Sequence, residues 1–474
     1  MNHPERYRGR EVVILGLARS GVAVAKLFHE HGAAVTVNDK KDRSACPEAD
    51  ELTALGISVV CGGHPDSLIH PGVALLVKNP GIPYSIAPIR EAERLGIEIV
   101  TEVEVANYIC AAPIIGITGS NGKTTTTTWV GLMLEEAGLQ PIIAGNIGRA
   151  LCEAAQEATP ANTMVVELSS FQLKGTSDFR PRIACLLNIS EAHLDYHGTM
   201  DDYIASKAKL FAAQQPDDVA VLNWDDAECR RIAGTVRAQL VPFSMRERLA
   251  RGVYVEPPLA SPGEPLTEAH RIVYRGADGE AVDVLPVKQL GIPGKHNAAD
   301  ALAAIAIAMS AGADVESVRK ALRDFRGVEH RLELVLERDG VTYYNNSKAT
   351  NSLATINAIE TFEQPIVLIA GGLERGADFR DLLPYFRRNV KAVVALGETR
   401  GKFAALAAEA GISAVKTVDT AKDAADALDQ AVRAAKSFAE PGDVVLLSPA
   451  CASWDMFESF EVRGRMFKES AHKL

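Results

Sequence analysis

Short runs of β-branched and aliphatic residues alternate with helical patterns along the whole chain. The first run, VVIL, covers residues 12–15. A helical pattern follows over 22–32, and a second apolar run, AVTVND, covers 34–39. This succession of strand, helix and strand predicts parallel sheets covered by helices. We therefore predict an α/β fold.

The same rhythm continues to the C-terminus. Further strands are predicted at ALLVKNPG, IEIV, PIIGIT, MVVELSS, RIACLLNIS, VAVLNWD, PIVLIAGG, AVVALG and DVVLLSP. Helices are predicted over 123–137, 296–309 and 315–325. The stretch 251–287 is rich in proline, glycine and charge, and we expect irregular or small-sheet structure there.

The length of 474 residues suggests two to four domains, at roughly 100–200 residues each. A new unit begins after residues 102–110. A third begins near Gly327 and opens with a predicted hairpin, whose turn is Asp339-Gly340. We predict three domains, with the bounds 1–108, 109–327 and 328–474.

Composition narrows the class of protein. The formal net charge of -11 argues against a nucleic-acid partner, which needs a basic face. No apolar stretch reaches about 18 residues, so we expect neither a signal peptide nor a membrane span. The seven cysteines form no CxxC pair, which favours reduced thiols and a cytoplasmic protein.

The first glycine-rich loop, GLARSG, covers residues 16–21 and lies between a predicted strand and a predicted helix. A dinucleotide-binding fingerprint would have glycine in place of Ala18 and an acidic residue about 20 positions on, where Asp39 is close. The loop is therefore either an ordinary tight turn or a site for a phosphate or diphosphate at the helix N-terminus.

The second loop, GSNGKTT, covers residues 119–125. A strict P-loop would have glycine where Ile117 stands, so this turn is a variant. Backbone N–H groups from Gly119 to Lys123 can still face phosphate oxygens, Lys123 can reach the terminal phosphates, and the Thr124 hydroxyl can bind Mg²⁺. The pattern predicts ATP or GTP binding.

Polar residues follow two later strands. Glu167 ends an apolar strand, and His193 lies just past the next one. Ligands collect at the carboxyl ends of strands in open α/β sheets, so both side chains should face the bound phosphates. A carboxylate suits Mg²⁺, whereas a histidine in this position is also compatible with an ordinary surface role. By pattern alone, Lys207 is a solvated helix lysine.

Eight segments of the chain resemble motifs of the Mur ligases and follow the order of that family. They are GITGSNGKTT, ELSSFQL, NISEAHLD, SKAKLF, GKHNAADALAA, EHRLE, NNSKATN and SPACASWDMFESFEVRGRMF. The resemblance covers nearly all of the chain. The glycine loop is shared with folylpolyglutamate synthase, whereas SKATN and SPACASWDMF resemble the D-glutamate-adding members of the family.

The resemblance implies a three-domain ligase of peptidoglycan precursor synthesis. We expect a monomer, because catalysis needs no second chain. An N-terminal Rossmann-like domain would hold the UDP end of the substrate, a central P-loop-type domain would bind ATP, and a C-terminal Rossmann-like domain would bring in the amino acid. ATP would convert the carboxylate of UDP-N-acetylmuramoyl-L-alanine to an acyl phosphate, which the amine of D-glutamate would attack.

The resemblance also implies roles for individual residues. The ATP site would comprise Gly119, Ser120, Asn121, Gly122, Lys123, Thr124, Thr125, Asn297, Arg331 and Asn346. Two Mg²⁺ ions would be held by Thr124, Glu167, His193 and Lys207, the last as a carbamate. The substrates would contact Leu17, Ala18, Asp39, Asn79, Gly81, Asn146, Ser169, His330, Thr350, Arg375, Ser453 and Phe460. The catalytic set would be Lys123, Glu167, His193, Lys207 and Lys348.

Two positions depart from the family pattern. Asn346 stands where the family usually has an aspartate that contacts the nucleotide ribose, and an amide can still hydrogen-bond hydroxyls but adds no charge. Arg375 stands where some relatives have lysine, and arginine can hold a carboxylate through two parallel hydrogen bonds. We expect Arg375 to keep its role and nucleotide affinity to depend on Asn346.

Two other functions compete with this hypothesis. A related ligase could use a folate or a later muramyl peptide, and the SKATN segment argues against it. A nucleotide-binding switch without ligase activity would not need Lys123, Glu167, His193 and Lys207 together. A dehydrogenase is disfavoured by Ala18. Domain closure over ATP would require hinges at 102–110 and 326–330.

Overall fold

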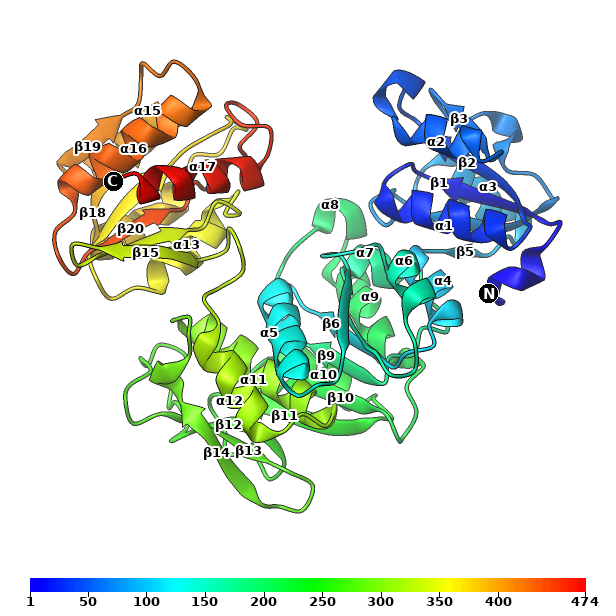
Figure 1. Ribbon diagram of the computed structural model, residues 1–474, viewed down its shortest axis with the longest axis horizontal. Helices are drawn as coiled ribbons and strands as arrows, with labels where there is room; N and C mark the ends of the chain where they lie inside the picture. Colours follow the sequence, from blue (N-terminus) through cyan, green and yellow to red (C-terminus); the bar gives the residue numbers. More distant parts are fainter. The chain divides into compact units, whose positions relative to one another are not determined.

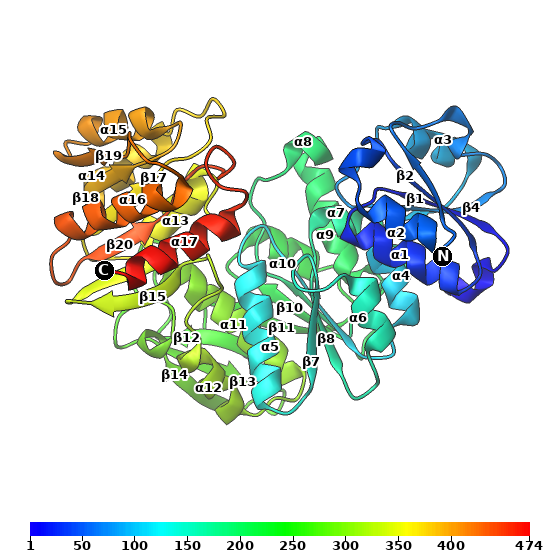
Figure 2. The ribbon, with the colours of Figure 1, turned by 45° about the horizontal axis from the view of Figure 1, so that its top comes forward.

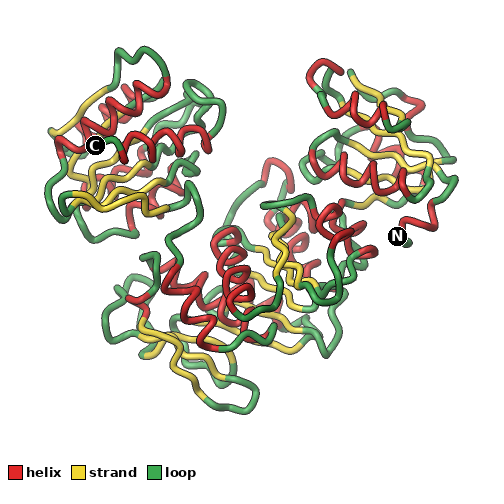
Figure 3. Tube along the Cα trace, in the orientation of Figure 1, coloured by secondary structure: helices red, strands yellow, loops and turns green.

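The computed structural model describes all residues, 1–474, and gathers the strands into three sheets (Figures 1 and 3). The α/β class is confirmed. Two compact units contain them: residues 1–289 with 299–323, and residues 290–298 with 324–474. The first unit therefore includes both the N-terminal and the central sheet. None of the helices has the length and apolar character that crossing a bilayer requires.

The N-terminal sheet is parallel, with the strand order β3-β2-β1-β4-β5. Its strands are β1 (Glu11–Leu15), β2 (Ala34–Asp39), β3 (Ser58–Cys61), β4 (Val73–Lys78) and β5 (Ile99–Val100). The helices are α1 (Arg19–Glu30), α2 (Glu48–Ala54), α3 (Ala87–Leu95) and α4 (Glu102–Ile109). Val12 and Ile14 pack into one core, and Val13 and Leu15 into another. Both faces of β1 are thus covered, as parallel strands require.

The central sheet has nine strands in the order β14-β13-β12-β11-β10-β9-β6-β8-β7. The strands are β6 (Ile114–Thr118), β7 (Pro141–Gly145), β8 (Thr163–Glu167), β9 (Ile183–Leu186), β10 (Val219–Asn223), β11 (Gln239–Ser244), β12 (Gly252–Glu256), β13 (Arg271–Arg275) and β14 (Ala281–Pro286). Strands β6 to β12 pair in parallel, and β12, β13 and β14 pair antiparallel. The small sheet expected over 251–287 is therefore a continuation of the large one.

Eight helices accompany the central sheet. They are α5 (Lys123–Glu136), α6 (Leu151–Glu157), α7 (Ser170–Lys174), α8 (Leu194–His197), α9 (Met200–Ala212), α10 (Ala227–Ala233), α11 (Lys295–Ser310) and α12 (Val315–Asp324). The three helices predicted at 123–137, 296–309 and 315–325 correspond to α5, α11 and α12, each within one residue at either end.

The third sheet has the order β15-β16-β20-β17-β18-β19, and only β15 and β16 pair antiparallel. Its strands are β15 (Glu333–Arg338), β16 (Val341–Asn345), β17 (Ile366–Ala370), β18 (Val390–Ala395), β19 (Ala414–Thr417) and β20 (Val444–Leu447). The helices are α13 (Ser352–Glu360), α14 (Leu383–Asn389), α15 (Arg400–Glu409), α16 (Ala424–Phe438) and α17 (Phe460–His472). The predicted hairpin turn is confirmed, with positive φ at both Asp339 and Gly340.

Alternate residues of β17 and β18 face opposite sides of this third sheet. Leu368 and Val393 share a core with α13, α14 and α15, whereas Ile369 and Val394 share another with α16 and α17. Figure 2 shows these five helices around the sheet. Each strand is buried on both faces, so the near-continuous apolar runs that predicted it follow from its position between two helix layers.

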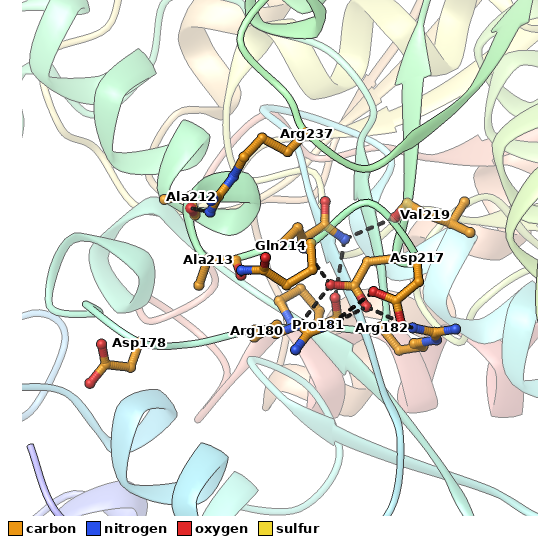
Figure 4. Close-up of polar contacts among 12 residues, drawn as sticks. Asp178, Arg180, Pro181, Arg182, Ala212, Ala213, Gln214, Asp217, Val219 and Arg237 are labelled. Carbon is orange, nitrogen blue, oxygen red and sulfur yellow. Dashed lines mark hydrogen bonds and ion pairs between the residues drawn. The ribbon is translucent and has the colours of Figure 1, made fainter.

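Charged residues stabilise the amino-terminal edge of the central sheet, where β9 and β10 begin. The Asp218 carboxylate accepts hydrogen bonds from Arg180 Nε at 2.7 Å and from Arg182 Nη1 at 3.0 Å. Arg182 Nη1 also donates to Asp217 Oδ2 at 2.7 Å (Figure 4). These ion pairs lie at the amino-terminal ends of the strands, on the side of the sheet away from the carboxyl ends.

The segment 102–110, expected to be a hinge, forms helix α4 and is tightly bonded to the central region. Glu102 Oε1 accepts a hydrogen bond from the Cys152 N–H at 2.9 Å. The Glu104 carboxylate accepts hydrogen bonds from three successive N–H groups, of Ser177, Asp178 and Phe179. Bending at α4 would break buried hydrogen bonds, so a hinge there is energetically disfavoured.

Candidate active site

The carboxyl ends of three adjacent strands, β9, β6 and β8, define the candidate site in the central sheet. The glycine loop follows β6, Glu167 is the last residue of β8, and the segment leading to His193 follows β9. The strand order places these groups at one edge, as predicted for ligand-binding residues of a parallel sheet.

The glycine loop is held in place by the loop after β9. Asn121 N–H donates to Asn188 Oδ1 at 2.9 Å, and Ser190 N–H donates to Ser120 Oγ at 2.9 Å. Ser120 Oγ also lies 2.8 Å from the Tyr203 hydroxyl. The loop is therefore preorganised at the N-terminus of α5, where backbone N–H groups favour an anion.

Gly122 is the position in this loop where any side chain would be strained. It has φ 82°, in the left-handed region, and a Cβ atom there would lie 2.1 Å from Asp300 Oδ1. Asp300 belongs to α11, so the carboxylate packs directly against the turn. Sequence reasoning did not identify Asp300, because only the packing of α11 brings it to the loop.

Two lysines converge behind the loop. Lys123 Nζ donates to Gly119 O at 2.8 Å and to Ser120 O at 3.0 Å, and Lys207 Nζ donates to the same Gly119 O at 2.8 Å. Lys207 is 1% exposed, and its Nζ lies 4.8 Å from the centre of the Tyr203 ring. Burial, together with the charge of Lys123, holds the pKa of Lys207 well below its usual value. The solvated lysine predicted from the helical pattern is therefore wrong, and burial favours the neutral amine form of this side chain.

His193 begins the short helix α8 in a left-handed conformation, with φ 57°. Its ring lies 4.9 Å from the Phe171 ring and 6.4 Å from the Tyr203 ring, between centroids. Burial and the positive charges of Lys123 and Lys207 lower the pKa of His193. The shift favours the neutral imidazole, the form in which a ring nitrogen can bind a metal ion.

Glu167 is 1% exposed, and its two carboxylate oxygens differ in environment. Oε1 accepts a hydrogen bond from Asn146 Nδ2 at 2.7 Å, whereas Oε2 is buried with no hydrogen-bond partner. A buried carboxylate oxygen left without a partner is costly, and a bound cation would satisfy it. Ser169 follows two residues later, where it caps α7 through a capping box with Gln172.

The first glycine loop brings three predicted residues together in the N-terminal sheet. Asp39 Oδ2 accepts a hydrogen bond from Leu17 N–H at 2.9 Å, and Asn79 N–H donates to Leu15 O at 2.8 Å. A Cβ atom on Gly16 would lie 2.6 Å from Asn79 Nδ2, so the turn needs glycine. Ala18 and Gly81 are exposed beside these groups.

The third sheet places several predicted residues near the start of α17. Lys348 Nζ lies 5.5 Å from the centre of the Phe460 ring, and Lys348 N–H donates to His330 O at 3.0 Å. His330 has φ 65°, and its ring packs against Gly464. Ser453 is buried nearby in sequence, in the loop that precedes α17. The segments EHR, NNSKATN and SPACASWDMF thus meet in one half of this unit.

Comparison with known sequences identifies the relatives of this chain. Family models described as the Mur ligase MurD-like N-terminal domain, the Mur ligase middle domain and the Mur ligase glutamate ligase domain match residues 10–101, 117–308 and 330–451. A Geobacillus protein (strain WCH70) is 48% identical over 469 residues, which is 99% of this chain and 98% of that protein. The chain belongs to the Mur ligase family.

Other full-length relatives are similarly close in sequence. A Bacillus subtilis (strain 168) protein is 45% identical, with complete coverage of both chains, and a Shouchella clausii protein is 49% identical over 98% of this chain and 97% of its own length. All three relatives are named UDP-N-acetylmuramoylalanine--D-glutamate ligase.

Solved Mur ligases share the fold. UDP-N-acetylmuramate-alanine ligase from Thermotoga maritima aligns with a TM-score of 0.57 at 19% identity, over 98% of this chain and 99% of that one. MurF from Acinetobacter baumannii gives a TM-score of 0.60 at 20% identity, over 98% and 93%. This Mur ligase therefore has the fold that the strand and helix pattern predicted.

Several predicted residues of this Mur ligase have surroundings that the sequence did not indicate. Asn346 is buried, its Nδ2 donating to Ser448 Oγ at 3.1 Å and its Oδ1 accepting from Leu332 N–H at 3.2 Å. Asn297 Nδ2 donates to Pro293 O. Thr350 and Arg375 are exposed, and Arg375 lies 4.9 Å from the ring centre of Trp454. Trp454 is 65% exposed and was not predicted to contribute.

Arg331 lies near His296, whose side chain is exposed. The surrounding protein and the charge of Arg331 lower the pKa of His296, so this histidine is neutral at physiological pH. His296 precedes Asn297 at the start of α11. The residues predicted to contact adenine and phosphate are thus flanked by a neutral imidazole that the sequence did not single out.

Proposed function

We propose that this Mur ligase uses ATP to join D-glutamate to the alanyl carboxylate of UDP-N-acetylmuramoyl-L-alanine. Its full-length identity of 45–49% with ligases of that name is the observation that carries the proposal. The convergence of Lys123, Lys207, Glu167 and Thr124 around one loop supports the chemistry, because amide formation from a carboxylate requires an activated acyl group.

The loop and Lys123 account for binding of the donor. The N–H groups at the start of α5 and the Lys123 ammonium offer positive charge to the ATP phosphates. Two anions, the terminal phosphoryl group and the substrate carboxylate, must approach each other. Fixed positive charge at this edge reduces their repulsion and holds donor and acceptor in line. The acyl phosphate then reacts with the D-glutamate amine, forming the amide bond and releasing phosphate.

Mg²⁺ fits the residues present. No three or more His, Cys, Asp or Glu side chains converge into a metal-binding group, so a divalent ion would need other oxygen ligands as well. Thr124 Oγ1 and the unpartnered Glu167 Oε2 would hold one ion, and His193 with modified Lys207 would hold a second. Bound Mg²⁺ would supply Lewis-acid stabilisation of the transferring phosphoryl group.

We propose that Lys207 is a carbamate in the active enzyme. Its neutral amine can add to CO₂, forming an N–C bond and releasing one proton, so that a cation becomes an anionic oxygen ligand. The low pKa of Lys207 favours the neutral form that this addition needs. A carbamate would also place a negative charge close to the Lys123 ammonium, since both lysine side chains reach Gly119 O.

The other proposed assignments follow the domains 1–108, 109–327 and 328–474. Leu17, Ala18, Asp39, Asn79 and Gly81 would hold the UDP end of the substrate around the first glycine loop. Asn146 and Ser169 would border its acyl end. Arg375, Ser453 and Phe460 would contact D-glutamate, and Lys348 and Thr350 would border the reaction centre. The nucleotide would also contact Asn297, His330, Arg331 and Asn346.

Phosphate release tests this function directly. The purified protein is given ATP, Mg²⁺ and UDP-N-acetylmuramoyl-L-alanine with D-glutamate, L-glutamate, L-lysine, meso-diaminopimelate or glycine in turn. Release with D-glutamate alone is the expected result. Release with another amino acid would reassign the acceptor, and no release with any of them while ATP still binds would overturn the ligase assignment.

A further inference from the structure

A buried hydrogen-bonded chain of three side chains lies beside the candidate site. His197 Nδ1 is 2.6 Å from Asp202 Oδ2, and His197 Nε2 is 3.0 Å from Ser170 Oγ. The serine, histidine and aspartate have the spacing of a nucleophile, a base and its orienting carboxylate. Ser170 is only 2% exposed, however, so no substrate can reach its hydroxyl. These three hydrogen-bonded side chains must therefore have a role other than nucleophilic catalysis.

Each member of the chain belongs to a different element. Ser170 is the first residue of α7, His197 is the last residue of α8, and Asp202 lies in the first turn of α9. The His197 side chain is fully buried against Phe171, with ring centroids 5.6 Å apart, and Tyr203, at 5.4 Å. One imidazole thus connects three helices that are otherwise separate along the chain.

The three helices carry residues of the proposed reaction centre. Ser169 caps α7, His193 caps α8, and Lys207 lies on α9. The connection to His193 is direct, since the backbone N–H of His197 donates to the backbone carbonyl of His193 at 3.0 Å, across the single turn of α8. The connection to α9 is equally short, because Asp202 O accepts a hydrogen bond from the hydroxyl of Ser206, the neighbour of Lys207.

Asp202 also bonds to a cation, the Lys174 ammonium. Lys174 Nζ lies 2.9 Å and 2.7 Å from the two Asp202 oxygens, and it comes from the end of α7. The Asp202 carboxylate is therefore held by the last residue of α7, Lys174, and by the last residue of α8, His197. Hydrogen bonds from a histidine and a lysine leave Asp202 little freedom to rotate, and this fixes the imidazole that it orients.

We propose that His197 is a positioning residue. Through its hydrogen bonds to Ser170 and Asp202, it fixes the positions of His193 and Lys207 relative to each other. The inference rests on the proposed function, because it gives His193 and Lys207 their roles. The bond to Asp202 is the more important of the two, since it is shorter and charge-assisted. A residue that supports metal ligands in this way typically changes metal affinity or activity by about 10–100-fold when it is lost.

Three substitutions separate the two hydrogen bonds. His197→Asn places an amide N–H near Nδ1 and retains a donor to Asp202, His197→Gln places its polar group nearer Nε2, and His197→Phe retains only the ring. We expect His197→Phe and His197→Gln to lower kcat by about 10–100-fold with little change in KM for the UDP-substrate, and His197→Asn to keep most of kcat.

His270→Phe is the matched control. His270 is also buried, and its Nδ1 accepts a hydrogen bond from Thr267 N–H at 2.9 Å, but it precedes β13 in the antiparallel part of the sheet. It should lose stability without losing kcat.

Nitrogen NMR of the full chain, labelled at histidine and lysine side chains, provides a readout besides activity. His197→Phe should shift the signals of His193 and Lys207, and His270→Phe should leave them in place. Unchanged signals and unchanged kcat in His197→Phe would overturn the proposal. If that variant fails to fold, equal kcat in His197→Asn and His197→Gln would overturn it instead.

The same experiments distinguish failure of the proposed function. If the wild-type chain releases no phosphate with any amino acid, the ligase assignment falls. The NMR shifts then decide the positioning role of His197 on their own, since they report the surroundings of His193 and Lys207 whatever reaction is catalysed.

Discussion

Asn146 Nδ2 donates a hydrogen bond to Glu167 Oε1 at 2.7 Å, and this bond fixes the carboxylate so that its other oxygen remains buried and unpartnered. The amide belongs to the loop after β7 and the carboxylate to the end of β8. Two neighbouring strands thus supply an orienting group and an oriented group. The arrangement resembles the outer support that metal-binding carboxylates generally receive.

Glu167→Gln should keep the oxygen that accepts from Asn146 and replace the unpartnered anionic oxygen with an amide NH₂ group, which cannot bind a cation. We expect a fall in kcat of about 100-fold or more and a requirement for higher Mg²⁺ concentration, measured by titrating phosphate release with Mg²⁺. Asn146→Ala should weaken Mg²⁺ activation by about 10–100-fold. Glu256→Gln, which alters only an ion pair with Arg248, is the control, and equal Mg²⁺ curves for Glu167→Gln and wild type would contradict the assignment.

Gly122→Ala should reduce both stability and ATP affinity, since its Cβ would overlap the Asp300 carboxylate as well as face a left-handed backbone. Gly138→Ala isolates the backbone effect, because Gly138 has φ 72° and open space around it. We expect about 1–2 kcal/mol of destabilisation for Gly138→Ala, and more for Gly122→Ala. Denaturant unfolding and calorimetric ATP titration measure the two effects, and equal losses in both variants would show that Asp300 does not restrict the loop.

Lys207→Ala should be nearly inactive, with partial recovery when a short carboxylic acid is added to replace the carbamate oxygens. Lys209→Ala is the control on the same helix, since Lys209 Nζ donates to Lys174 O and Thr176 O and has no proposed role in the reaction. Carbon NMR with labelled bicarbonate should show a carbamate signal in the wild type that Lys207→Ala lacks. Full activity of Lys207→Ala would refute the carbamate.

Asp218→Asn should destabilise the central sheet without changing the reaction. Burial alone would raise the pKa of Asp218, but hydrogen bonds from Arg180, the Gln215 N–H and Arg182 outweigh it, so the pKa lies below its usual 3.8. A carboxyl group with a lowered pKa stabilises the fold above pH 3.8, and this contribution is lost as the pH falls through the pKa of the folded state.

We expect Asp218→Asn to lower the free energy of unfolding by about 2–3 kcal/mol at pH 7. Asp217→Asn, at a site that is 67% exposed, should cost about 0.2–1 kcal/mol. The difference between Asp218→Asn and wild type should narrow when unfolding is measured toward pH 3. A difference that is constant with pH would indicate lost packing instead of lost charge.

The sequence predicted most of the sheet interior and missed strands for identifiable reasons. Strands β3, β7 and β19 lie at sheet edges, where short, half-exposed segments lack the apolar runs of central strands. Strand β11 contains Pro242, which disfavours a strand assignment, although it pairs with β10 inside the sheet. The long helices α5, α11 and α12 were located closely, because apolar periodicity extends over several turns.

The candidate site was predictable where loops follow strands, and less so where helices pack. Glu167 and the glycine loop follow from their place after strands, which needs only the order of elements. The burial of Lys207 does not, because its helix pattern is that of a solvent-facing residue until α9 is packed against the loop. Asp300 and His197 likewise depend on contacts between distant segments, and nothing in their local sequence marks them.

The crowding of Gly122 against Asp300 has a consequence for inhibition. A compound that contacts the backbone of residues 119–123 would bind atoms that no substitution can remove, and at Gly122 any side chain would have to displace the Asp300 carboxylate and adopt a left-handed backbone. Resistance by mutation would then have to arise outside the loop, at positions where change weakens the compound without weakening ATP. Compounds directed at this turn should therefore meet fewer routes of escape than compounds directed at the exposed Arg375 and Trp454.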